Sequence, residues 1–274
     1  MTTIAFIGAG NMASALMGGM LENGVPAQNI IASDPSAEQI AALKAKWGIQ
    51  GTTDNNDAIA KADVVVIAVK PQVMEAVLTP IKEALQTKKP MLISVAAGIN
   101  LHSIDIWSGG DLPIVRCMPN TPALVQQGAS GLFANDQVSA EQRSEAETIL
   151  SAVGISVWVN SEPELDAVTA VSGSGPAYYF LLMEAMIAAG QKLGLSEETA
   201  TQLTLKTALG AATMASQSDD SPAELRRKVT SPNGTTEQAI NTFINNGLHD
   251  LVEKALTAAS DRSESLCEEL GAKK

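Results

Sequence analysis

TIAFIGAGNMA, residues 3–13, joins a short apolar run to a glycine-rich turn, and a segment with helical spacing follows that ends near Gly24. A G-x-G-x-x-A turn between a strand and a helix is typical of a dinucleotide-binding βαβ unit. Its glycines let the backbone approach a pyrophosphate, whose charge is stabilised at the N-terminus of the helix. A tight turn that binds no ligand is the plainer alternative.

The residues after this turn continue the alternation of strand and helix up to about residue 160. The expected strands are residues 3–7, 30–33, 64–69, 91–95, 114–118, 131–134 and 156–159, and helical spacing lies between them, as in residues 37–46 and 73–85. Residues 64–69 are apolar at every position, as in a parallel strand buried between two layers of helices. The pattern predicts an α/β domain with a doubly wound, Rossmann-type sheet over residues 1–160.

The second part of the chain, residues 161–274, reads as helix only. Helical periodicity covers residues 164–193, 197–216, 222–228, 236–245 and 249–270. Residues 221–224 (SPAE) form a capping-box pattern, and residues 235–238 (TTEQ) fit the same template. The run YYFLLM, residues 178–183, leaves almost no polar face, and such a helix must be buried on every side. We therefore expect an all-helical domain that packs against a second subunit, so that the protein is at least a homodimer.

Composition narrows the classes of function. The 274 residues suffice for two domains, and the formal net charge of −12 argues against nucleic acid or an anionic membrane as partner. Cys117 and Cys267 lie far apart, which indicates neither a disulfide framework nor a metal site. Neither a signal peptide nor a membrane-spanning run is recognisable, and we expect a cytoplasmic protein.

Asp34 stands at the end of the second expected strand, where an acid usually accepts from the adenosine ribose and favours NAD. At about 5 Å and an effective dielectric constant of about 20, each unit charge of a 2′-phosphate would cost roughly 3 kcal/mol beside it. The alternative is a solvated cap, with Pro35 turning the carboxylate outward. The sequence thus leaves the choice between NADH and NADPH open.

Two further loops follow expected strands at the edge where ligands bind in this architecture. Residues 68–71 (AVKP) contain the cation Lys70, for which a solvated loop lysine is the alternative. Residues 117–122 (CMPNTP) form a loop stiffened by two prolines, and a purely structural turn is equally open there.

Acid–base residues are missing from these loops. His102 and His249 lie outside them. Residues 172–176 (SGSGP) form either a nucleophile turn or, as we favour, a close approach of the backbone to a cofactor or a partner. A dinucleotide site without an acid–base residue suits hydride transfer to a C=N bond. A protonated imine is already electrophilic, so the site needs only to align donor and acceptor.

The segment KVTSPNGTTEQAI, residues 228–240, is a polar gap between two helical runs. Pro232 and the pair Asn233-Gly234 stop a helix. A helix that starts at Thr235 or Thr236 offers free N–H groups and a positive dipole end, which stabilises an anion by up to about 2 kcal/mol. The gap therefore predicts a seat for a small carboxylate.

These motifs together resemble those of the pyrroline-5-carboxylate reductases. The resemblance rests on IGAGNM (7–12), AVKP (68–71), SVAAG (94–98), CMPNTPA (117–123), VSGSGPAY (171–178) and above all PAELRRKVTSPNGTTEQAI (222–240), in order along the whole chain. It implies reduction of 1-pyrroline-5-carboxylate to L-proline with NADPH or NADH. It also implies a Rossmann domain, a helical dimerisation domain and interlocked dimers, which assemble into decamers in many members of the family.

The resemblance also assigns roles by position. The residues implied in cofactor binding are Ile7, Gly8, Ala9, Gly10, Asn11 and Met12 at the pyrophosphate, Ser33, Asp34 and Asn55 near the ribose, and Ala68, Val69, Lys70 and Pro71 near the nicotinamide. Those implied in substrate binding are Asn120, Thr121, Ser231, Pro232, Asn233, Gly234, Thr235 and Thr236. Thr236 would bind the ring nitrogen and relay its proton. Asn233 replaces a glycine that is common in the family, and Asn tolerates the left-handed conformation.

Two alternatives differ in function class. A related dehydrogenase of a small hydroxy acid would need a catalytic lysine in the helical half, where Lys192, Lys206 and Lys228 are available but none has a glycine-rich context. A non-catalytic dinucleotide-binding protein would bind the cofactor and turn over no cyclic imine acid.

Overall fold

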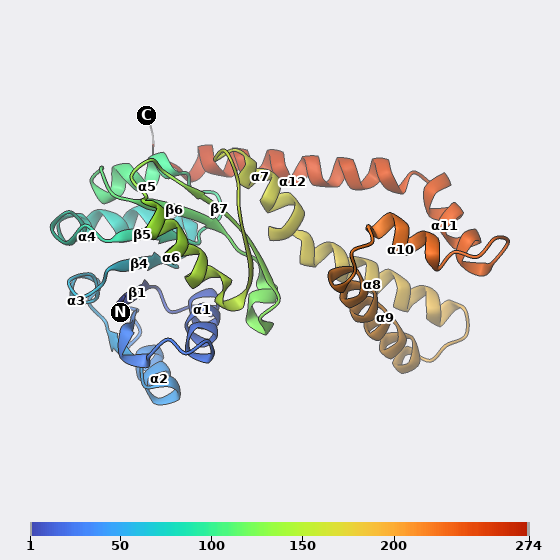
Figure 1. Ribbon diagram of the computed structural model, residues 1–274, viewed down its shortest axis with the longest axis horizontal. Helices are drawn as coiled ribbons and strands as arrows, with labels where there is room; N and C mark the ends of the chain where they lie inside the picture. The colour runs from blue at the N-terminus through green and yellow to red at the C-terminus, as the bar shows by residue number, and fades with distance from the viewer. Residues whose placement is uncertain (1, 273–274) are drawn as a thin grey trace. The chain divides into compact units, whose positions relative to one another are not determined.

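One mixed eight-stranded sheet organises the N-terminal part of the computed structural model, which describes residues 2–272 (Figure 1). The strands are β1 (Ile4–Ile7), β2 (Ile30–Ser33), β3 (Gln50–Thr52), β4 (Val64–Ile67), β5 (Met91–Ser94), β6 (Ile114–Met118), β7 (Gly128–Ala134) and β8 (Gly154–Trp158). Their order is β3-β2-β1-β4-β5-β6-β7-β8, and only the β6–β7 pair is antiparallel. The strand order reverses between β1 and β4, which is the topological switch point.

Helices cover both faces of this sheet. They are α1 (Asn11–Glu22), α2 (Ala37–Trp47), α3 (Asn55–Ile59), α4 (Met74–Lys88), α5 (Leu101–Ser108), α6 (Ala140–Leu150) and α7 (Glu164–Val168). Ile4 and Phe6 of β1 belong to one apolar cluster with Leu16 of α1, whereas Ile7 belongs to a second cluster with Leu78 of α4. Alternate residues of a strand face opposite sides, so β1 is buried from both, and the predicted doubly wound Rossmann-type domain is confirmed.

The seven expected strands are all present, with ends that move by at most three residues. The sequence analysis missed β3, since its three residues, Gln-Gly-Thr, carry no apolar run. Gly51 of β3 lies so close to α2 that a Cβ there would be 2.7 Å from Ile40 Cγ2. A short edge strand that depends on such a close approach gives no local signal.

The rest of the chain is helical, as expected. It comprises a π-helix (Thr169–Gly173), α8 (Gly175–Lys192), α9 (Glu197–Gln217), α10 (Pro222–Lys228), α11 (Thr235–Asn245) and α12 (Leu248–Leu270). The single helix expected over residues 164–193 was wrong, because it divides into α7, the π-helix and α8 around Gly173 and Pro176. Within residues 2–272, no helix is both long and apolar enough to cross a membrane.

Two compact units emerge from the contacts within the chain. One contains the residues up to Ser174 and those from Ala258 onward, and the other is Gly175–Thr257. The end of α12 belongs to the first unit, where Ser263 Oγ donates to Asp166 Oδ1 at 2.6 Å. The division expected between residues 160 and 161 marks where the strands end, and it does not coincide with these units. Helical periodicity does not reveal which element a helix packs against.

The buried Arg116 side chain, which forms an ion pair with Glu162, also links α12 to the sheet. Arg116 on β6 donates to Glu162 Oε1 at 2.9 Å, and the same oxygen accepts the N–H of Leu101 at 2.7 Å. The second Arg116 nitrogen donates to Cys267 Sγ of α12 at 3.5 Å. Because the Arg116 side chain is only 6% exposed, these contacts satisfy a charge that would otherwise be buried alone.

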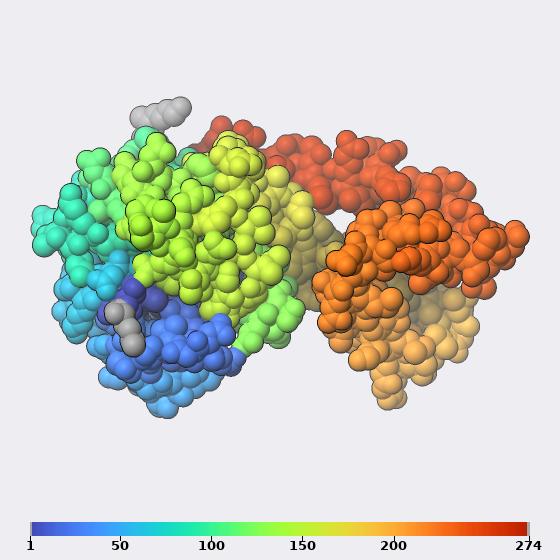
Figure 2. Space-filling model, viewed as in Figure 1, coloured from blue at the N-terminus to red at the C-terminus, as the bar shows by residue number. Residues whose placement is uncertain are grey.

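The unit Gly175–Thr257, gold to orange in Figure 2, exposes many large apolar side chains. On α8 and α9 these are Tyr179, Phe180, Leu181, Leu182, Met186, Leu203, Leu205, Leu209 and Met214. Leu181 is 66% exposed, although α8 is apolar along most of its length. An apolar surface of this extent is typical of a subunit interface.

The first prediction concerns Cys117 on β6. Burial raises the pKa of its thiol from about 9 to about 12, although a hydrogen bond with Ser130 lowers this pKa in part. At a pH between these two pKa values, the Cys117 thiol has lost its proton in the unfolded chain and keeps it in the folded chain. The free energy of unfolding therefore falls as the pH rises above about 9. We expect the free energy of unfolding to fall less steeply from pH 9 upward in Cys117→Ala than in the wild type. Urea titrations at several pH values measure this, and equal slopes would contradict it.

Candidate active site

The parallel strands end in register at one edge of the sheet. Ile7 of β1 lies opposite Ser33 of β2 and Ile67 of β4, and Ser94 of β5 lies opposite Ile67 and Arg116 of β6. The loops that leave this carboxyl edge contain Gly8–Met12, Asp34, Asn55, Ala68–Pro71, Ala96–Gly98 and Asn120–Thr121. Ligands of open α/β sheets bind at this edge, at the switch point. All loops of the first unit that the sequence analysis selected therefore lie at the expected edge.

The two glycines of the fingerprint have different roles. Gly8 has φ +94°, and a Cβ there would lie 2.7 Å from the carbonyl oxygen of Ala68 and 2.9 Å from Val69 Cγ1. The fold itself thus requires Gly8. Gly10 has φ −72°, and a Cβ on it would meet no atom of the described residues within 4 Å. The side of Gly10 is open, and α1 begins directly after it without a side-chain cap from residues 2–272, which fits a pyrophosphate at the helix N-terminus.

Asp34 holds the fingerprint loop from the side. Its Oδ2 accepts the N–H of Ala9 and its Oδ1 accepts the N–H of Ser36, each at 2.9 Å. Gln39 Nε2 donates to the carbonyl oxygen of Ala9 at 3.0 Å, so the residue is held from both of its peptide groups. The carboxylate thus caps two backbone N–H groups of the turn, one in a partly buried and one in an exposed bond, which agrees with the alternative of a cap and shows that Pro35 does not turn the carboxylate away from the loop.

Ser33 and Asn55 lie in contact at the ends of β2 and β3. The buried Ser33 Oγ donates to Asn55 Oδ1 at 2.6 Å. With its oxygen bound there, Asn55 turns its Nδ2, with two N–H donors, to the other side. Two of the three residues that the resemblance implies near the ribose are thus joined by a hydrogen bond, which leaves the Asn55 Nδ2 as a donor. Lys70, in the next loop, is exposed and precedes a short 3-10 helix, Pro71–Val73.

The loop after β6 is fixed by the side chain of Asn120. Its Nδ2 donates to the carbonyl oxygen of Ser172 at 3.1 Å, and its Oδ1 accepts the N–H of Ala129 at 2.9 Å. Asn120 is 8% exposed, whereas Thr121, which begins a 3-10 helix (Thr121–Val125), is exposed. The sequence left open whether this loop is functional or structural. In the structure, both ends of the Asn120 amide bind backbone groups and hold the loop in place.

Residues 172–176 do not form a nucleophile turn. Ser172 lies in the π-helix and its hydroxyl donates to the Val168 carbonyl oxygen at 3.0 Å. A Cβ on Gly173 would lie 2.4 Å from Met118 Cε. The favoured interpretation, a close approach of the backbone to a cofactor or a partner, stays a prediction, because the contact seen here is with Met118 of the same chain.

The polar gap forms a tight turn in the second unit. Gly234 N–H donates to the Ser231 carbonyl oxygen at 3.0 Å, and Asn233 adopts the left-handed conformation with φ +59°, as its residue type allows. The capping box expected at residues 235–238 was wrong. Gly234 is the N-cap of α11 and, within the described residues, no side chain caps this end, while Glu237 Oε2 accepts the N–H of Asn233 at 2.8 Å.

This cap leaves the first turn of α11 open to a ligand. A glycine N-cap lacks the side-chain oxygen that normally accepts an N–H of the first turn. Thr235 and Thr236 are exposed at that end, together with Ser231, Pro232 and Asn233. At residues 221–224, by contrast, the Ser221 hydroxyl accepts the Glu224 N–H at 3.3 Å and caps the helix, but the Glu224 carboxylate binds Arg227 and does not complete the expected capping box.

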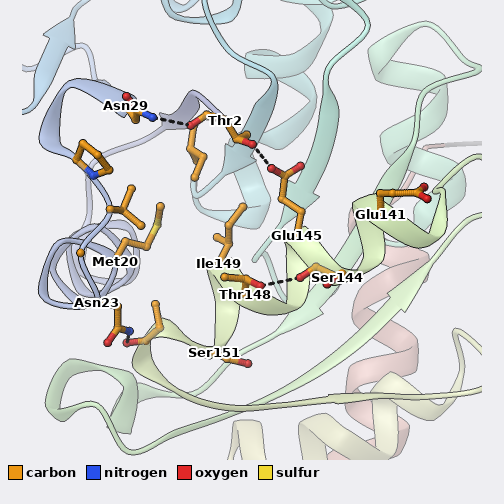
Figure 3. Close-up of a pocket in the computed structure, with 15 residues that line it drawn as sticks. Thr2, Met20, Asn23, Asn29, Glu141, Ser144, Glu145, Thr148, Ile149 and Ser151 are labelled. Carbon is orange, nitrogen blue, oxygen red and sulfur yellow. Dashed lines mark hydrogen bonds between the residues drawn. The ribbon is translucent and has the colours of Figure 1, made fainter.

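A separate cavity of about 820 Å³ lies at the opposite edge of the sheet (Figure 3). Thr2 and Ile4 at the beginning of β1, Met20 of α1 and Ile149 of α6 line it. Because β1 ends in the fingerprint at its other end, this cavity is remote from the switch point.

The fold and the glycine loop at the switch point define the class of a Rossmann-type dinucleotide-dependent oxidoreductase with a helical second part. A pyrroline-5-carboxylate reductase from Pseudomonas aeruginosa is 60% identical over 268 residues, which cover 98% of each chain. The chain belongs to the pyrroline-5-carboxylate reductase family.

Family models and solved structures agree with this assignment. Residues 3–98 match the model for NADP oxidoreductase, coenzyme F420-dependent, and residues 162–266 match that for pyrroline-5-carboxylate reductase dimerisation. A pyrroline-5-carboxylate reductase structure from Coxiella burnetii is similar over 99% of both chains, with TM-score 0.94 and 44% identity. A pyrroline carboxylate reductase from Plasmodium falciparum with NADP bound covers 97% of this chain and 98% of its own, with TM-score 0.83 and 31% identity.

The second prediction separates the two glycines. Gly8→Ala should destabilise the protein by more than about 2 kcal/mol, because alanine is strained at a positive φ and its Cβ would overlap with the carbonyl oxygen of Ala68. Gly10→Ala should leave the melting temperature nearly unchanged and weaken NADPH binding at least about tenfold, since its methyl group projects where the pyrophosphate would lie. Calorimetry and fluorescence titration measure both quantities. A Gly10→Ala variant that binds NADPH normally would place the cofactor elsewhere.

Proposed function

We propose that this chain reduces 1-pyrroline-5-carboxylate to L-proline, the last step of proline biosynthesis, with NADPH or NADH as cofactor. The observation that carries this proposal is 60% identity over 98% of the chain to a pyrroline-5-carboxylate reductase. The open glycine loop at the switch point supplies the dinucleotide site that the reaction needs. The enzyme is an oxidoreductase that acts on a C=N bond.

The cofactor site is built from the carboxyl edge of the sheet. Bound NAD(P)H supplies the hydride. We assign Ile7, Gly8, Ala9, Gly10, Asn11 and Met12 to the pyrophosphate, Ser33, Asp34 and Asn55 to the surroundings of the ribose, and Ala68, Val69, Lys70 and Pro71 to the nicotinamide side. Gly10 leaves room, the N-terminus of α1 offers N–H groups, and the Asn55 amide is already oriented by Ser33. The side chain of Asp34 acts on the loop through Ala9.

The substrate carboxylate binds, in this proposal, at the turn before α11. Ser231, Pro232, Asn233, Gly234, Thr235 and Thr236 form the seat, and Asn120 and Thr121 lie in the loop that borders the nicotinamide and the substrate. The uncapped N–H groups at Thr235 and Thr236 suit an anion. The Thr236 hydroxyl then hydrogen-bonds the ring nitrogen and relays to it the proton that the imine takes up, while the hydride goes to the C=N carbon, so that the reaction needs no histidine.

The quaternary structure follows from the helical part. We assign residues 1–160 to the dinucleotide-binding domain and residues 161–274 to dimerisation and substrate binding. The match of residues 162–266 to a dimerisation model and the exposed apolar side chains of α8 and α9 support a homodimer. We further propose decamers built from these dimers, and action in the cytoplasm, where a reductase can use the pool of reduced nicotinamide cofactor.

The direct test follows NADH and NADPH oxidation separately, each with and without 1-pyrroline-5-carboxylate. Turnover that depends on the imine supports the proposal, and binding without turnover would support a non-catalytic dinucleotide-binding protein. A hydroxy-acid dehydrogenase would instead depend on a lysine of the helical half. Lys228 pairs with Asp220, which holds its charge in place, so Lys206→Ala is the informative variant for that alternative.

The third prediction tests the carboxylate seat. Thr236→Ala should lower kcat/KM for 1-pyrroline-5-carboxylate by about 10- to 100-fold, the worth of one hydrogen bond to a charged group, and leave NADPH affinity nearly unchanged. Thr242→Ala is the matched control, because its hydroxyl lies on the same helix and donates to the Gln238 carbonyl oxygen at 2.8 Å. Equal loss of substrate turnover and cofactor affinity in Thr236→Ala would mean that the seat is misplaced.

The fourth prediction tests the subunit interface. Leu181→Glu places a charge in the exposed apolar surface of α8, and burying that charge against a second subunit is unfavourable. We expect the variant to sediment as a monomer with little activity. Gln191→Glu adds the same charge to the same helix at a residue that is already polar, and it should stay a dimer. A dimeric, active Leu181→Glu enzyme would contradict the proposed interface.

A further inference from the structure

We propose that Asn120 is a positioning residue of the reductase, whose side-chain amide fixes the loop after β6 without touching substrate or cofactor. The inference rests on the proposed function, because the loop borders the site assigned above. Its basis is geometric: both ends of the amide bind backbone groups of other elements, and the side chain is nearly buried.

The two hydrogen bonds of Asn120 close the loop on two sides. Oδ1 accepts the N–H of Ala129 at 2.9 Å, so the amide spans the 3-10 helix that separates β6 from β7. Nδ2 donates to the Ser172 carbonyl oxygen at 3.1 Å and joins the loop to the π-helix. With 8% of its surface exposed, the residue has little surface left for a ligand.

The sequence explains why the Ser172 carbonyl oxygen in the π-helix is free to accept from Asn120. In an α-helix the Ser172 carbonyl would accept the N–H of residue 176, which is Pro176 and has none. The Ser174 N–H instead donates to the Thr169 carbonyl oxygen at 2.8 Å, the i to i−5 bond of a π-helix. The Asn120 amide donates to Ser172 where the proline cannot.

The two hydrogen bonds of Asn120, which together tether the loop after β6, hold the part of it that lies at the carboxyl edge of the sheet. Asn120 follows Met118 by two residues and precedes the exposed Thr121. If the amide is lost, the backbone from Pro119 to Thr121 can shift relative to the ends of β4 and β5. A shift of about 1 Å at such a site costs on the order of 100-fold in rate, because alignment is what the reaction needs.

The decisive variant is Asn120→Asp, which keeps the acceptor for Ala129 and replaces the donor. When ionised, the new carboxylate faces the Ser172 carbonyl oxygen and repels it. When protonated, its O–H can donate to that oxygen and restore the tether, and burial beside a carbonyl favours the protonated form. The activity of the variant relative to the wild type should therefore rise as pH falls, and the ratio removes the pH dependence of the substrate itself.

The chain offers a closely matched control in Asn135, at the other end of β6. Its Oδ1 accepts the N–H of Ile114 at 3.0 Å and its Nδ2 donates to the Leu112 carbonyl oxygen at 2.8 Å. Asn135→Asp introduces the same carboxylate against a carbonyl, away from the carboxyl edge. It should change the melting temperature with pH and leave the relative kcat/KM flat.

The experiment compares both variants with the full-length wild type from about pH 8.5 to about pH 5.5. We expect Asn120→Asp to lose about 10- to 100-fold in kcat at the high end, with KM and NADPH affinity changed by less than about twofold, and to recover most of it at the low end. A flat ratio, or the same profile in Asn135→Asp, would overturn the inference. A rise in KM with kcat preserved would also overturn it, since it would make Asn120 a substrate ligand.

Two further outcomes are distinguishable. If Asn120→Asp does not fold, Asn120→Ser, which cannot bridge Ala129 and Ser172, should lower kcat at every pH with KM nearly unchanged, and a normal kcat would overturn the inference. If the wild type itself does not turn over 1-pyrroline-5-carboxylate, the proposed function fails, and with it the assignment of Asn120 to that reaction.

Discussion

Strand β1 pairs in parallel with β2 on one side and with β4 on the other, and this pairing fixes the position of the backbone at Gly8, where β1 ends. The Gly8 N–H donates to the Ser33 carbonyl oxygen and the Ala68 N–H donates to that of Ile7, both at 2.8 Å, so the turn begins between two fixed strand ends. No side chain fits at Gly8, because Ala68 occupies the space. The chain can turn here only because Gly8 has no side chain, and the open side at Gly10, two residues further on, is where we propose that the pyrophosphate binds.

Several polar side chains of the candidate site bind backbone groups and thereby fix the loops around it. The Asp34 carboxylate binds the Ala9 N–H, the Asn120 amide joins Ala129 to Ser172, and the Glu237 carboxylate binds the Asn233 N–H. Each of three loops thus has one polar side chain that fixes a peptide group. This suits a reaction in which the acceptor is already electrophilic and the rate depends on alignment.

Local patterns predicted the features that depend on a few adjacent residues. The apolar run Val64–Ile67 is a buried strand, and Asn233 takes the left-handed turn, since residue type suffices for both. The bond from the Ser36 N–H to Asp34 is local turn chemistry, but the bond from the Ala9 N–H was not predictable, because Ala9 lies 25 residues earlier in the chain. The same holds for β3, whose position depends on packing against α2.

Strand β6 connects these observations to the helical part. The chain leaves the first unit through the π-helix, which Asn120 holds just after β6, and it returns through α12, whose end Arg116 holds from within β6. Arg116 is paired with Glu162 in a buried position, and removal of one partner of such a pair costs about 3–5 kcal/mol. Both connections to the unit Gly175–Thr257 therefore contact β6 or the loop that follows it. A change in the register of β6 would therefore move both contacts, because Asn120 follows this strand and Arg116 lies within it.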